Sequence, residues 1–307
     1  MEKNKIHVID CVAGMKLIDS ESIDICVTSP PYNMGTIYNK YNDKNNRIDY
    51  LTWMDNVFLS VKNVLKSNGS FWLNMGYSNV DPWIGIDVAL VARKHFVLQN
   101  NFIWVKSISV DGKTSGHLKP IQSTKFASPT WEHIFHFTKN GDVDCDRLSI
   151  GVPYMWDRVE KVRPARIRIK IAKKLGYKNQ KDFNENATEE KKKYMEEEFK
   201  KKMKEDTKDY TKRCGGNCWF IPYETIGNNE QKGNSQKGFH PAIFPTKLVD
   251  QCIKFSGLKS GIILDPFMGS GTSAIAAKNN NLDYIGFDID QDYVEFAEER
   301  IKNLFIQ

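Results

Sequence analysis

Short apolar runs alternate with longer amphipathic segments at both ends of the chain. Short apolar runs bounded by turn residues are typical of buried strands, and apolar positions three and four residues apart are typical of helices. Strands are therefore expected at 5–10, 23–29, 70–76, 102–107, 132–139, 261–266 and 284–290. Helices are expected at 49–69, 82–95, 245–257, 271–280 and 291–305, with Gly69 as the C-cap of the first. This alternation predicts one α/β domain with a seven-stranded, mainly parallel sheet covered by helices.

The middle of the chain, from about 141 to 239, does not follow this alternation. It is charged, carries scattered aromatic residues and contains several glycines towards its end. Long irregular connections inside a compact domain are uncommon and are usually functional. We therefore expect an inserted region at 141–239 between two halves of one domain, 1–140 and 240–307.

Charge is concentrated in this middle region. Of the net charge of +6, residues 158–213 contribute +9, from 20 Lys and Arg against 11 Asp and Glu, and the rest of the chain contributes −3. The segment "EEKKKYMEEEFKKKMKED" mixes both signs and is typical of a solvated helix face. The earlier "RVEKVRPARIRIKIAKK" is almost entirely positive and suits contact with phosphates. Its candidate phosphate contacts are Arg163, Arg166, Arg168 and Lys170, with a solvated amphipathic helix as the alternative.

Composition argues against several classes of protein. The chain has 307 residues, of which 40% are hydrophobic, enough to bury a large core. The sequence contains no run of about 18 apolar residues, so no membrane helix is predicted. The N-terminus has no signal-peptide pattern. A cytoplasmic, nucleoid-associated protein is therefore expected. Six scattered cysteines are typical of reduced thiols. Cys214 and Cys218 lack a second pair of matching spacing, so no metal site is predicted.

A glycine-containing turn near the C-terminus, "ILDPFMGSGTSAIAAK", lies between a predicted strand and a predicted helix. Gly269 and Gly271 let the backbone approach a ligand, and the helix that begins at Thr272 offers free N–H groups. Asp288 ends the next strand, where a carboxylate can accept hydrogen bonds from ribose hydroxyls. The pattern predicts an adenosine-type ligand, with a plain tight turn as the alternative. It lacks the G-x-G-x-x-G of NAD sites and the Gly-Lys-Ser/Thr of triphosphate sites.

The motif "DPFMGSGT" closely resembles the S-adenosylmethionine loop of DNA amino-methyltransferases. A second stretch, "ICVTSPPYNMG", contains Ser29-Pro30-Pro31-Tyr32 and resembles the Ser/Asp/Asn-Pro-Pro-Tyr/Phe corner of the same family. The corner precedes the cofactor loop, which is similar to the beta-type, permuted members. The likeness covers 1–140 and 240–307, and it implies a Rossmann-like class I methyltransferase fold with target recognition in the inserted region.

The resemblance also implies roles for individual residues. The catalytic corner comprises Ser29, Pro30, Pro31 and Tyr32. The residues assigned to S-adenosylmethionine are Asp10, Thr28, Lys247, Asp265, Pro266, Phe267, Gly269, Ser270, Gly271, Thr272, Asp288 and Ile289. Asp10 follows Ile9, where the family usually has Gly, and this departure weakens its assignment.

The corner suits an amine target for a chemical reason. An exocyclic amine on cytosine or adenine shares its lone pair with the ring and is a poor nucleophile. The Ser29 Oγ and the Pro30 carbonyl can accept both amino hydrogens and so favour a tetrahedral nitrogen, and the prolines hold these acceptors in place. Tyr32 offers a flat face on which an extruded base can stack.

Three features favour cytosine-N4 over adenine-N6 as the target. Ser29 resembles the cytosine-N4 members, as do "HPAIFP" and the spacing of Trp219, Ile221 and Pro222. Asn33 is more frequent in the adenine group, so adenine-N6 stays the alternative.

Duplex DNA is the expected polymer, with a flipped base as the target. Additional DNA contacts are expected from Asn33, Tyr38 and Lys113. The protein is expected to be a monomer or homodimer that accompanies a restriction endonuclease. Rival interpretations are an RNA or protein methyltransferase, a non-catalytic DNA-binding module and, more remotely, an NAD-dependent oxidoreductase.

Overall fold

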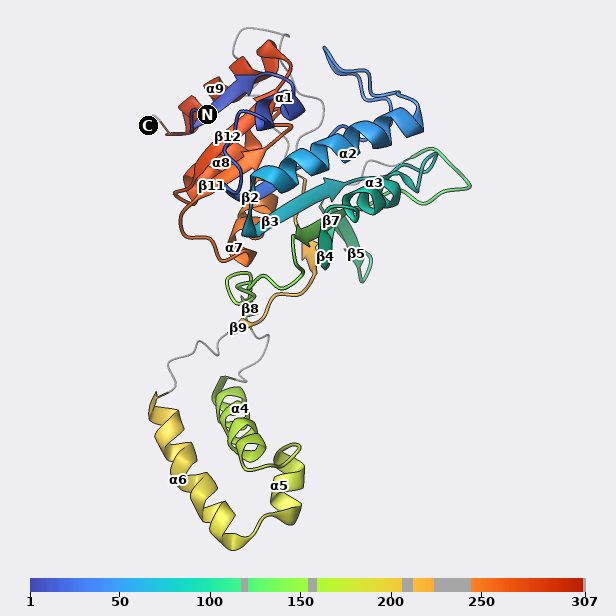
Figure 1. Cartoon of the computed structure of the whole chain (residues 1–307). Helices are drawn as coiled ribbons and strands as arrows, with labels where there is room; N and C mark the ends of the chain where they lie inside the picture. Colours follow the sequence, from blue (N-terminus) through green and yellow to red (C-terminus); the bar gives the residue numbers. More distant parts are fainter. Residues whose placement is uncertain (117–120, 154–158, 206–211, 224–243, 306–307) are drawn as a thin grey trace. The chain divides into compact units, whose positions relative to one another are not determined.

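The computed structural model describes residues 1–116, 121–153, 159–205, 212–223 and 244–305, without the side chains of 159–163 and 305. The chain divides into two compact units (Figure 1). The first comprises 1–146 and 216–307, and the second comprises 147–215. The second unit is shorter than the predicted inserted region, 141–239, because the chain after residue 215 returns to the main sheet.

The first unit is built on a sheet that has eight strands in the described part of the chain, in the order β1-β12-β11-β2-β3-β7-β4-β10. The strands are β1 (Lys5–Val8), β2 (Ile23–Thr28), β3 (Leu65–Met75), β4 (Val97–Val105), β7 (Trp131–Thr138), β10 (Cys218–Phe220), β11 (Ile262–Asp265) and β12 (Asp283–Asp288). Among them β7 is antiparallel to both neighbours, and the other pairs are parallel. The predicted α/β class is confirmed, and all seven predicted strands are present. The strand count was one too low, because β10 comes from the region assigned to the insertion.

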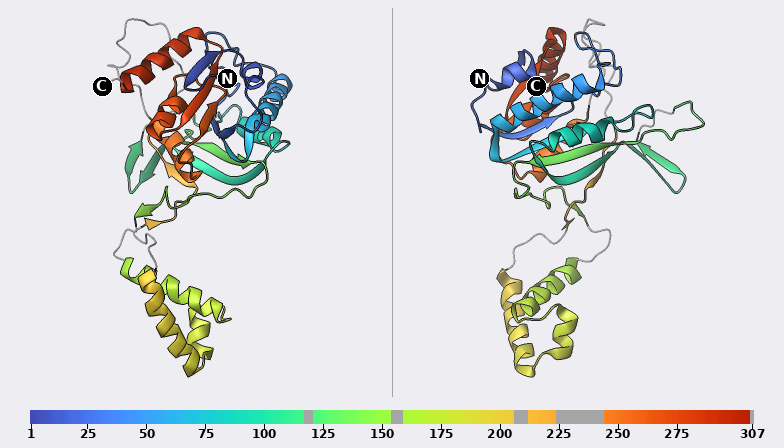
Figure 2. Two further views of the ribbon diagram at one scale, coloured as in Figure 1. Left: turned by 60° about the vertical axis from the view of Figure 1, so that its left-hand side comes forward. Right: turned by 45° about the vertical axis from the view of Figure 1, so that its right-hand side comes forward.

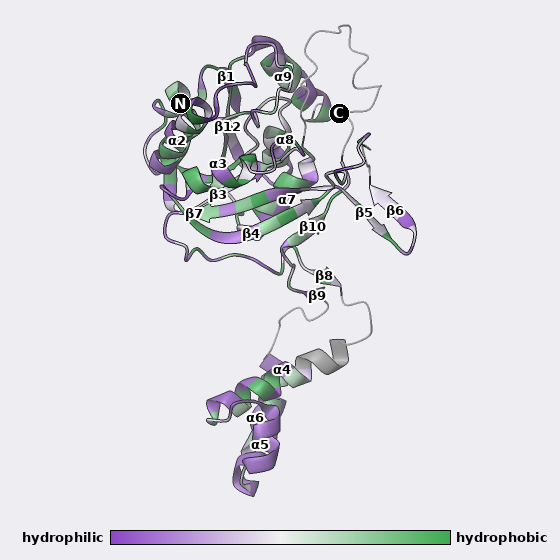
Figure 3. Cartoon of the chain, turned by 90° about the vertical axis from the view of Figure 1, so that its right-hand side faces the viewer, coloured by the Kyte–Doolittle hydropathy of each residue, from purple (hydrophilic) through white to green (hydrophobic). Residues whose placement is uncertain are grey.

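Helices cover both faces of this sheet (Figure 2). One face carries α1 (Cys11–Met15), α2 (Arg47–Val64) and α3 (Ile84–Ala92), and the other carries α7 (Thr246–Phe255), α8 (Thr272–Asn279) and α9 (Gln291–Phe305). The strands carry many hydrophobic residues (Figure 3). Phe58 of α2 packs on Phe71 of β3, and Phe71 packs in turn on Phe96 and Phe137, with ring centroids 5.2–5.8 Å apart. This aromatic cluster holds the first helical layer against the sheet.

The end of α2 differs from the prediction. We expected the helix to end with Gly69 as its C-cap, but it ends at Val64 and Leu65 is already extended, with ψ 137°. Leu65 is buried and pairs with Ile23 of β2, so strand pairing takes the chain out of the helix four residues early. Gly69 therefore lies inside β3, where an added Cβ would come 2.8 Å from the Leu65 side chain.

The strand order creates a crevice between β2 and β11. These two strands are parallel neighbours, with Ile263 opposite Ile25 and Leu264 opposite Cys26. The chain leaves β2 towards β3 on one side and leaves β11 towards β12 on the other. Where neighbouring parallel strands lead in opposite directions, their carboxyl ends leave an open crevice that α/β proteins use for ligands. Both sequence motifs follow these two strands.

The second unit contains α4 (Val159–Lys174), α5 (Gln180–Asn186) and α6 (Glu189–Glu205), together with a short pair of strands, β8 (Val152–Pro153) and β9 (Lys212–Arg213). The helices enclose a small core of their own, made of Ile167, Ile171, Ala172, Phe183 and Met195. Outside this core the helices are largely hydrophilic (Figure 3). The region predicted to be irregular thus contains a helical unit with a separate core.

A hairpin that the sequence analysis did not predict follows β4. Its strands are β5 (Ser107–Val110) and β6 (Lys113–Gly116), joined by Asp111 and Gly112, which both have positive φ. Such turns favour an Asp-Gly pair, because Asp and Gly tolerate the left-handed conformation. The hairpin extends away from the main sheet (Figure 3). No helix in the described part of the chain is long and apolar enough to cross a membrane.

Candidate active site

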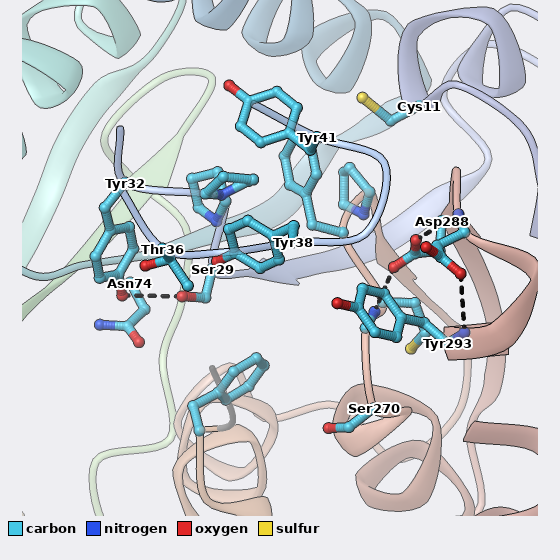
Figure 4. A pocket seen from close by; sticks show the side chains of 18 of the residues that line it. Cys11, Ser29, Tyr32, Thr36, Tyr38, Tyr41, Asn74, Ser270, Asp288 and Tyr293 are labelled. Atoms are coloured by element: carbon cyan, nitrogen blue, oxygen red, sulfur yellow. Dashed lines mark hydrogen bonds between the residues drawn. The ribbon is translucent and has the colours of Figure 1, made fainter. Parts of the chain in front are cut away.

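A cavity of about 270 Å³ lies in the first unit, along the edge where the parallel strands end. Several of the residues that line it come from the ends of neighbouring strands of the sheet. Asp288 ends β12, Ser29 follows β2, Asn74 lies near the end of β3 and Glu132 lies near the start of the antiparallel β7. Figure 4 shows Ser29, Tyr32 and Asn74 on one side of the cavity and Asp288, Tyr293 and Ser270 on the other.

The cavity brings most of the predicted catalytic and cofactor residues together. The predicted residues that line it are Asp10, Ser29, Pro30, Pro31, Tyr32, Tyr38, Pro266, Phe267, Gly269, Ser270, Asp288 and Ile289. Residues more than 230 positions apart in sequence therefore line one cavity. The parallel pairing of β2 with β11 is the cause of this proximity.

The proline corner is held rigidly. The hydroxyl of Tyr50, on α2, donates to the Pro31 carbonyl at 2.7 Å. The Ser29 Oγ lies 2.9 Å from the Tyr32 hydroxyl, which donates to Glu132 Oε2 at 3.1 Å. Burial, and secondly the Glu132 charge, raise the pKa of Tyr32 well above its usual value, so this hydroxyl stays protonated. The corner thus presents fixed oxygen atoms to the cavity.

The glycine turn rests on a buried carboxylate, Asp265. It accepts hydrogen bonds from Thr28 Oγ1 at 2.6 Å, from Ser273 Oγ at 2.6 Å and from the Phe267 amide at 3.0 Å. Burial raises the pKa of Asp265 to about 6, although these three donors oppose the shift. Thr28 and Asp265 therefore join the ends of β2 and β11 beneath the cavity instead of lining it.

The turn itself has the conformation that its glycines allow. Gly271 has φ 81° and is the N-cap of α8, as predicted for a helix that begins at Thr272. The Gly269 amide donates to Asp288 Oδ2 at 3.0 Å. Thr272 is buried beneath the turn. The backbone of the turn is therefore anchored to the end of β12.

The donor set of this half suits S-adenosylmethionine. Asp288 places a carboxylate on the cavity wall for ribose hydroxyls, and burial raises its pKa. Ile9, Phe267 and Ile289 line the same wall and offer apolar surface to an adenine ring. Asp10 lines the cavity and also caps α1, because its Oδ1 accepts from the Ala13 amide at 2.9 Å. A second role for Asp10 towards adenine would have to coexist with this cap.

Residues 33–45, here called the tyrosine loop, cover part of the cavity. Thr36, Tyr38, Lys40 and Tyr41 line it. The buried Asp43 carboxylate holds the loop by accepting from the amides of Asn33, Met34 and Thr36 at 2.7, 3.1 and 2.9 Å. Tyr41 stacks on Trp53 of α2, and Trp53 meets the Phe267 ring edge-on at 5.4 Å. The loop is thus connected to the glycine turn through aromatic contacts.

Several predicted residues lie elsewhere. Lys247 is exposed on α7 and does not line the cavity. The Asn33 side chain is hydrogen-bonded within the tyrosine loop, to the Asn45 backbone in both directions. Lys113 is exposed on the β5–β6 hairpin.

The four predicted phosphate contacts are all on α4, in the second unit. Arg168 forms an ion pair with Glu196 of α6 and lies over the Phe199 ring, so it stabilises the helix pair. Arg166 and Lys170 are exposed. Arg163 lies in the part of α4 whose side chains the structure does not describe.

The cavity wall also includes residues that no sequence pattern predicted. They are Asn74, Trp104, Lys106, Glu132 and Tyr223. Glu132 stood at the start of a predicted strand, "EHIFHFTK", but an acid before an apolar run has no specific meaning without the strand order. Trp104 pairs directly with Glu132 across β4 and β7, which local patterns do not reveal.

Known proteins resemble this chain in sequence and in fold. A sequence model of a family described as DNA methylase matches residues 23–299. Type II methyltransferase M.ScaI from Streptomyces caespitosus is 24% identical over 296 residues, which cover 95% of this chain and 79% of that protein.

Two solved structures have the same fold. PvuII DNA methyltransferase, described as cytosine-N4-specific, aligns with a TM-score of 0.59 at 16% identity, over 98% of this chain and 90% of that one. M1.HpyAVI, in a structure of its complex with SAM, aligns with a TM-score of 0.51 at 15% identity. The alignment covers 96% of this chain and 98% of M1.HpyAVI. These likenesses agree with the predicted Rossmann-like sheet.

Proposed function

The chain belongs to the N6/N4 DNA methylase family, and we propose that it methylates the N4 amine of a flipped cytosine in duplex DNA. It is an S-adenosylmethionine-dependent DNA methyltransferase. One observation supports the proposal most strongly: the Ser29–Tyr32 corner and the glycine turn line the same cavity. An amine held by the corner therefore lies next to the cofactor half of the site.

Bound S-adenosylmethionine supplies an electrophilic methyl group on a sulfonium that leaves as a neutral thioether. The chain's own residues hold the other reactant. The Ser29 Oγ and the Pro30 carbonyl accept the two amino hydrogens, which favours a tetrahedral nitrogen with its lone pair free to attack. The N–C bond forms as the C–S bond breaks, and the nitrogen then loses one proton to solvent. The prolines and the Tyr50–Pro31 hydrogen bond keep the acceptors in position before reaction.

Cytosine is favoured over adenine on residues of this chain. Ser29 stands where adenine-N6 members usually have Asp. Asn33, which favoured adenine, pairs with Asn45 inside the tyrosine loop, and this local role accounts for its presence. The PvuII enzyme, described as cytosine-N4-specific, supports the same choice. Adenine-N6 is the alternative outcome of the test below.

We also propose that the inserted region, 141–239, recognises the target sequence. Its helical unit carries the basic helix α4, on which Arg166 and Lys170 are exposed, and exposed cations suit phosphate contact. Tyr38 on the cavity wall and Lys113 on the hairpin are further candidates for DNA contact. M.ScaI is described as a type II methyltransferase, so a restriction–modification role with a partner endonuclease is proposed, with the protein acting as a monomer or homodimer.

The test is analysis of DNA from cells that express the protein. Enzymatic digestion and mass spectrometry should detect N4-methylcytosine, and mapping of the marks should place them in one short sequence. N6-methyladenine instead would move the assignment to adenine. DNA without any new mark, from cells that contain folded protein, would favour the non-catalytic DNA-binding module.

A further inference from the structure

Glu132 lies on the catalytic side of the cavity, and its carboxylate has three side-chain donors. No sequence motif pointed to it. Its Oε2 accepts from the Tyr32 hydroxyl at 3.1 Å and from Asn74 Nδ2 at 2.8 Å. Its Oε1 pairs with Lys106 Nζ. The side chain of Glu132 is only 13% exposed. A largely buried carboxylate with three donors is held in one orientation.

The surroundings of Glu132 hold this arrangement firmly. The Lys106 ammonium lies 4.8 Å from the centroid of the Trp104 ring, which orients it towards the carboxylate. A Cβ added to Gly76 would lie 2.6 Å from Tyr32 Cε2 and 3.0 Å from Glu132 Oε1. The absence of a side chain at Gly76 thus lets the tyrosine ring and the carboxylate pack closely together.

The carboxylate determines the direction of the hydrogen bonds that lead to Ser29. A carboxylate only accepts, so the single hydroxyl proton of Tyr32 is donated to Glu132. In the 2.9 Å contact between Tyr32 and Ser29, the serine must then be the donor. With its proton used in this way, the Ser29 Oγ offers only lone pairs to the cavity.

We propose that Glu132 is a positioning residue, which acts through Tyr32 to fix Ser29 as a hydrogen-bond acceptor for the target amine. This inference rests on the proposed function, and it explains how a serine hydroxyl can act as a hydrogen-bond acceptor for the target amine. A serine hydroxyl is otherwise free to turn its proton towards the amino group and repel it. Asn74 supports the same polarity, because its Nδ2 donates to Glu132 and to the His133 carbonyl, which leaves only its oxygen as an acceptor.

The test substitutes Glu132→Gln in the full-length protein. A glutamine amide can keep its oxygen on Lys106 and turn its NH₂ towards Tyr32. The hydrogen bonds from Glu132 through Tyr32 to Ser29 would then reverse direction and point the Ser29 proton into the cavity. We expect the single-turnover rate of methyl transfer from tritiated S-adenosylmethionine to unmodified genomic DNA to fall by about 10²-fold. The cofactor Kd should stay within about twofold of the wild type, because Glu132 lies on the other side of the cavity.

A double-mutant cycle separates positioning from general structural damage. Tyr32→Phe removes the hydroxyl that links Glu132 to Ser29 and should lower the rate by a similar factor. The double variant should be no slower than Tyr32→Phe alone, since Glu132 acts only through Tyr32. Asp55→Asn is the matched control. The Asp55 carboxylate, on α2 and outside the cavity, accepts a hydrogen bond from His95 at 2.8 Å. Its loss should leave the rate unchanged.

Each other result has a definite meaning. A wild-type rate for Glu132→Gln, a loss confined to the cofactor Kd, or additive losses in the double variant would overturn this inference alone. A folded wild-type protein that transfers no methyl group to DNA would overturn the proposed function and the inference with it.

Discussion

Removal of the Asp43 carboxylate should release the tyrosine loop without unfolding the domain. Asp43 is 2% exposed and accepts hydrogen bonds from three loop amides, those of Asn33, Met34 and Thr36. The substitution Asp43→Ala deletes this acceptor. The contacts left within the loop include the pairing of Asn33 with Asn45.

The expected magnitude follows from these bonds. A hydrogen bond to a charged group contributes about 1.5–3 kcal/mol, and amides released to water recover part of this. We therefore expect the loop to lose about 3 kcal/mol of local stability, enough to leave it ordered in a small fraction of molecules. Tyr38 and Tyr41 would then leave the cavity wall, and the contact of Tyr41 with Trp53 beside the glycine turn would be lost. The cofactor Kd should rise by between about 10-fold and about 10²-fold.

Two measurements check this prediction. Isothermal titration with S-adenosylmethionine gives the Kd, and hydrogen exchange reports whether the amides of the tyrosine loop lose protection while those of β2 keep it. Asp49→Ala is the control, because Asp49 is an exposed acid in the first turn of α2 and should change stability by about 0.5 kcal/mol at most. An Asp43→Ala variant that binds the cofactor like the wild type with its loop amides still protected would contradict this role of Asp43. The same effect in Asp49→Ala would also contradict it.

Three further predictions concern the cofactor site and the core. Asp288→Ala should weaken S-adenosylmethionine binding by about 10²-fold in the same titration, because it removes the charged acceptor from the cofactor wall; unchanged affinity would exclude Asp288 from the site. Gly286→Ala should lower the free energy of unfolding by about 1–3 kcal/mol in urea, because the new Cβ would overlap the Met268 side chain; an equally stable variant would show that Met268 has room to move. Burial lowers the pKa of His136 to about 4, so as pH falls this histidine is protonated in the unfolded chain before it is protonated in the folded protein. The free energy of unfolding should therefore decrease by about 3 kcal/mol as pH falls from about 6.5 to 4. His136→Gln should flatten the acid side of the stability–pH curve from urea titrations, and an unchanged slope would contradict the shift.

The two motifs were predictable because each is local. The strand, the proline corner and the glycine turn are all contiguous in sequence, and the chemistry of Ser29 or Asp288 follows from residue type and position at a strand end. That the motifs meet followed from the family likeness, and the pairing of β2 with β11 gives the physical reason.

The missed features depend on tertiary structure. Glu132 and Lys106 lie together only because β7 runs antiparallel between β3 and β4, and an isolated strand pattern carries no direction. The strand β10 has three residues, too few for a periodic signal. Val64 ends α2 because Leu65 pairs with Ile23, which overrides the glycine signal at Gly69. The Asp111-Gly112 turn did carry a hairpin signal, which was overlooked.

We propose that the proline corner and the glycine turn form one site for methyl transfer to an exocyclic amine of a DNA base. The most direct measurement is mass spectrometry of nucleosides from unmodified DNA incubated with the purified protein and S-adenosylmethionine labelled with a deuterated methyl group. We expect labelled N4-methylcytosine with the wild type and its loss with Ser29→Ala, which still binds the cofactor. Label on no base, or full labelling by Ser29→Ala, would contradict it.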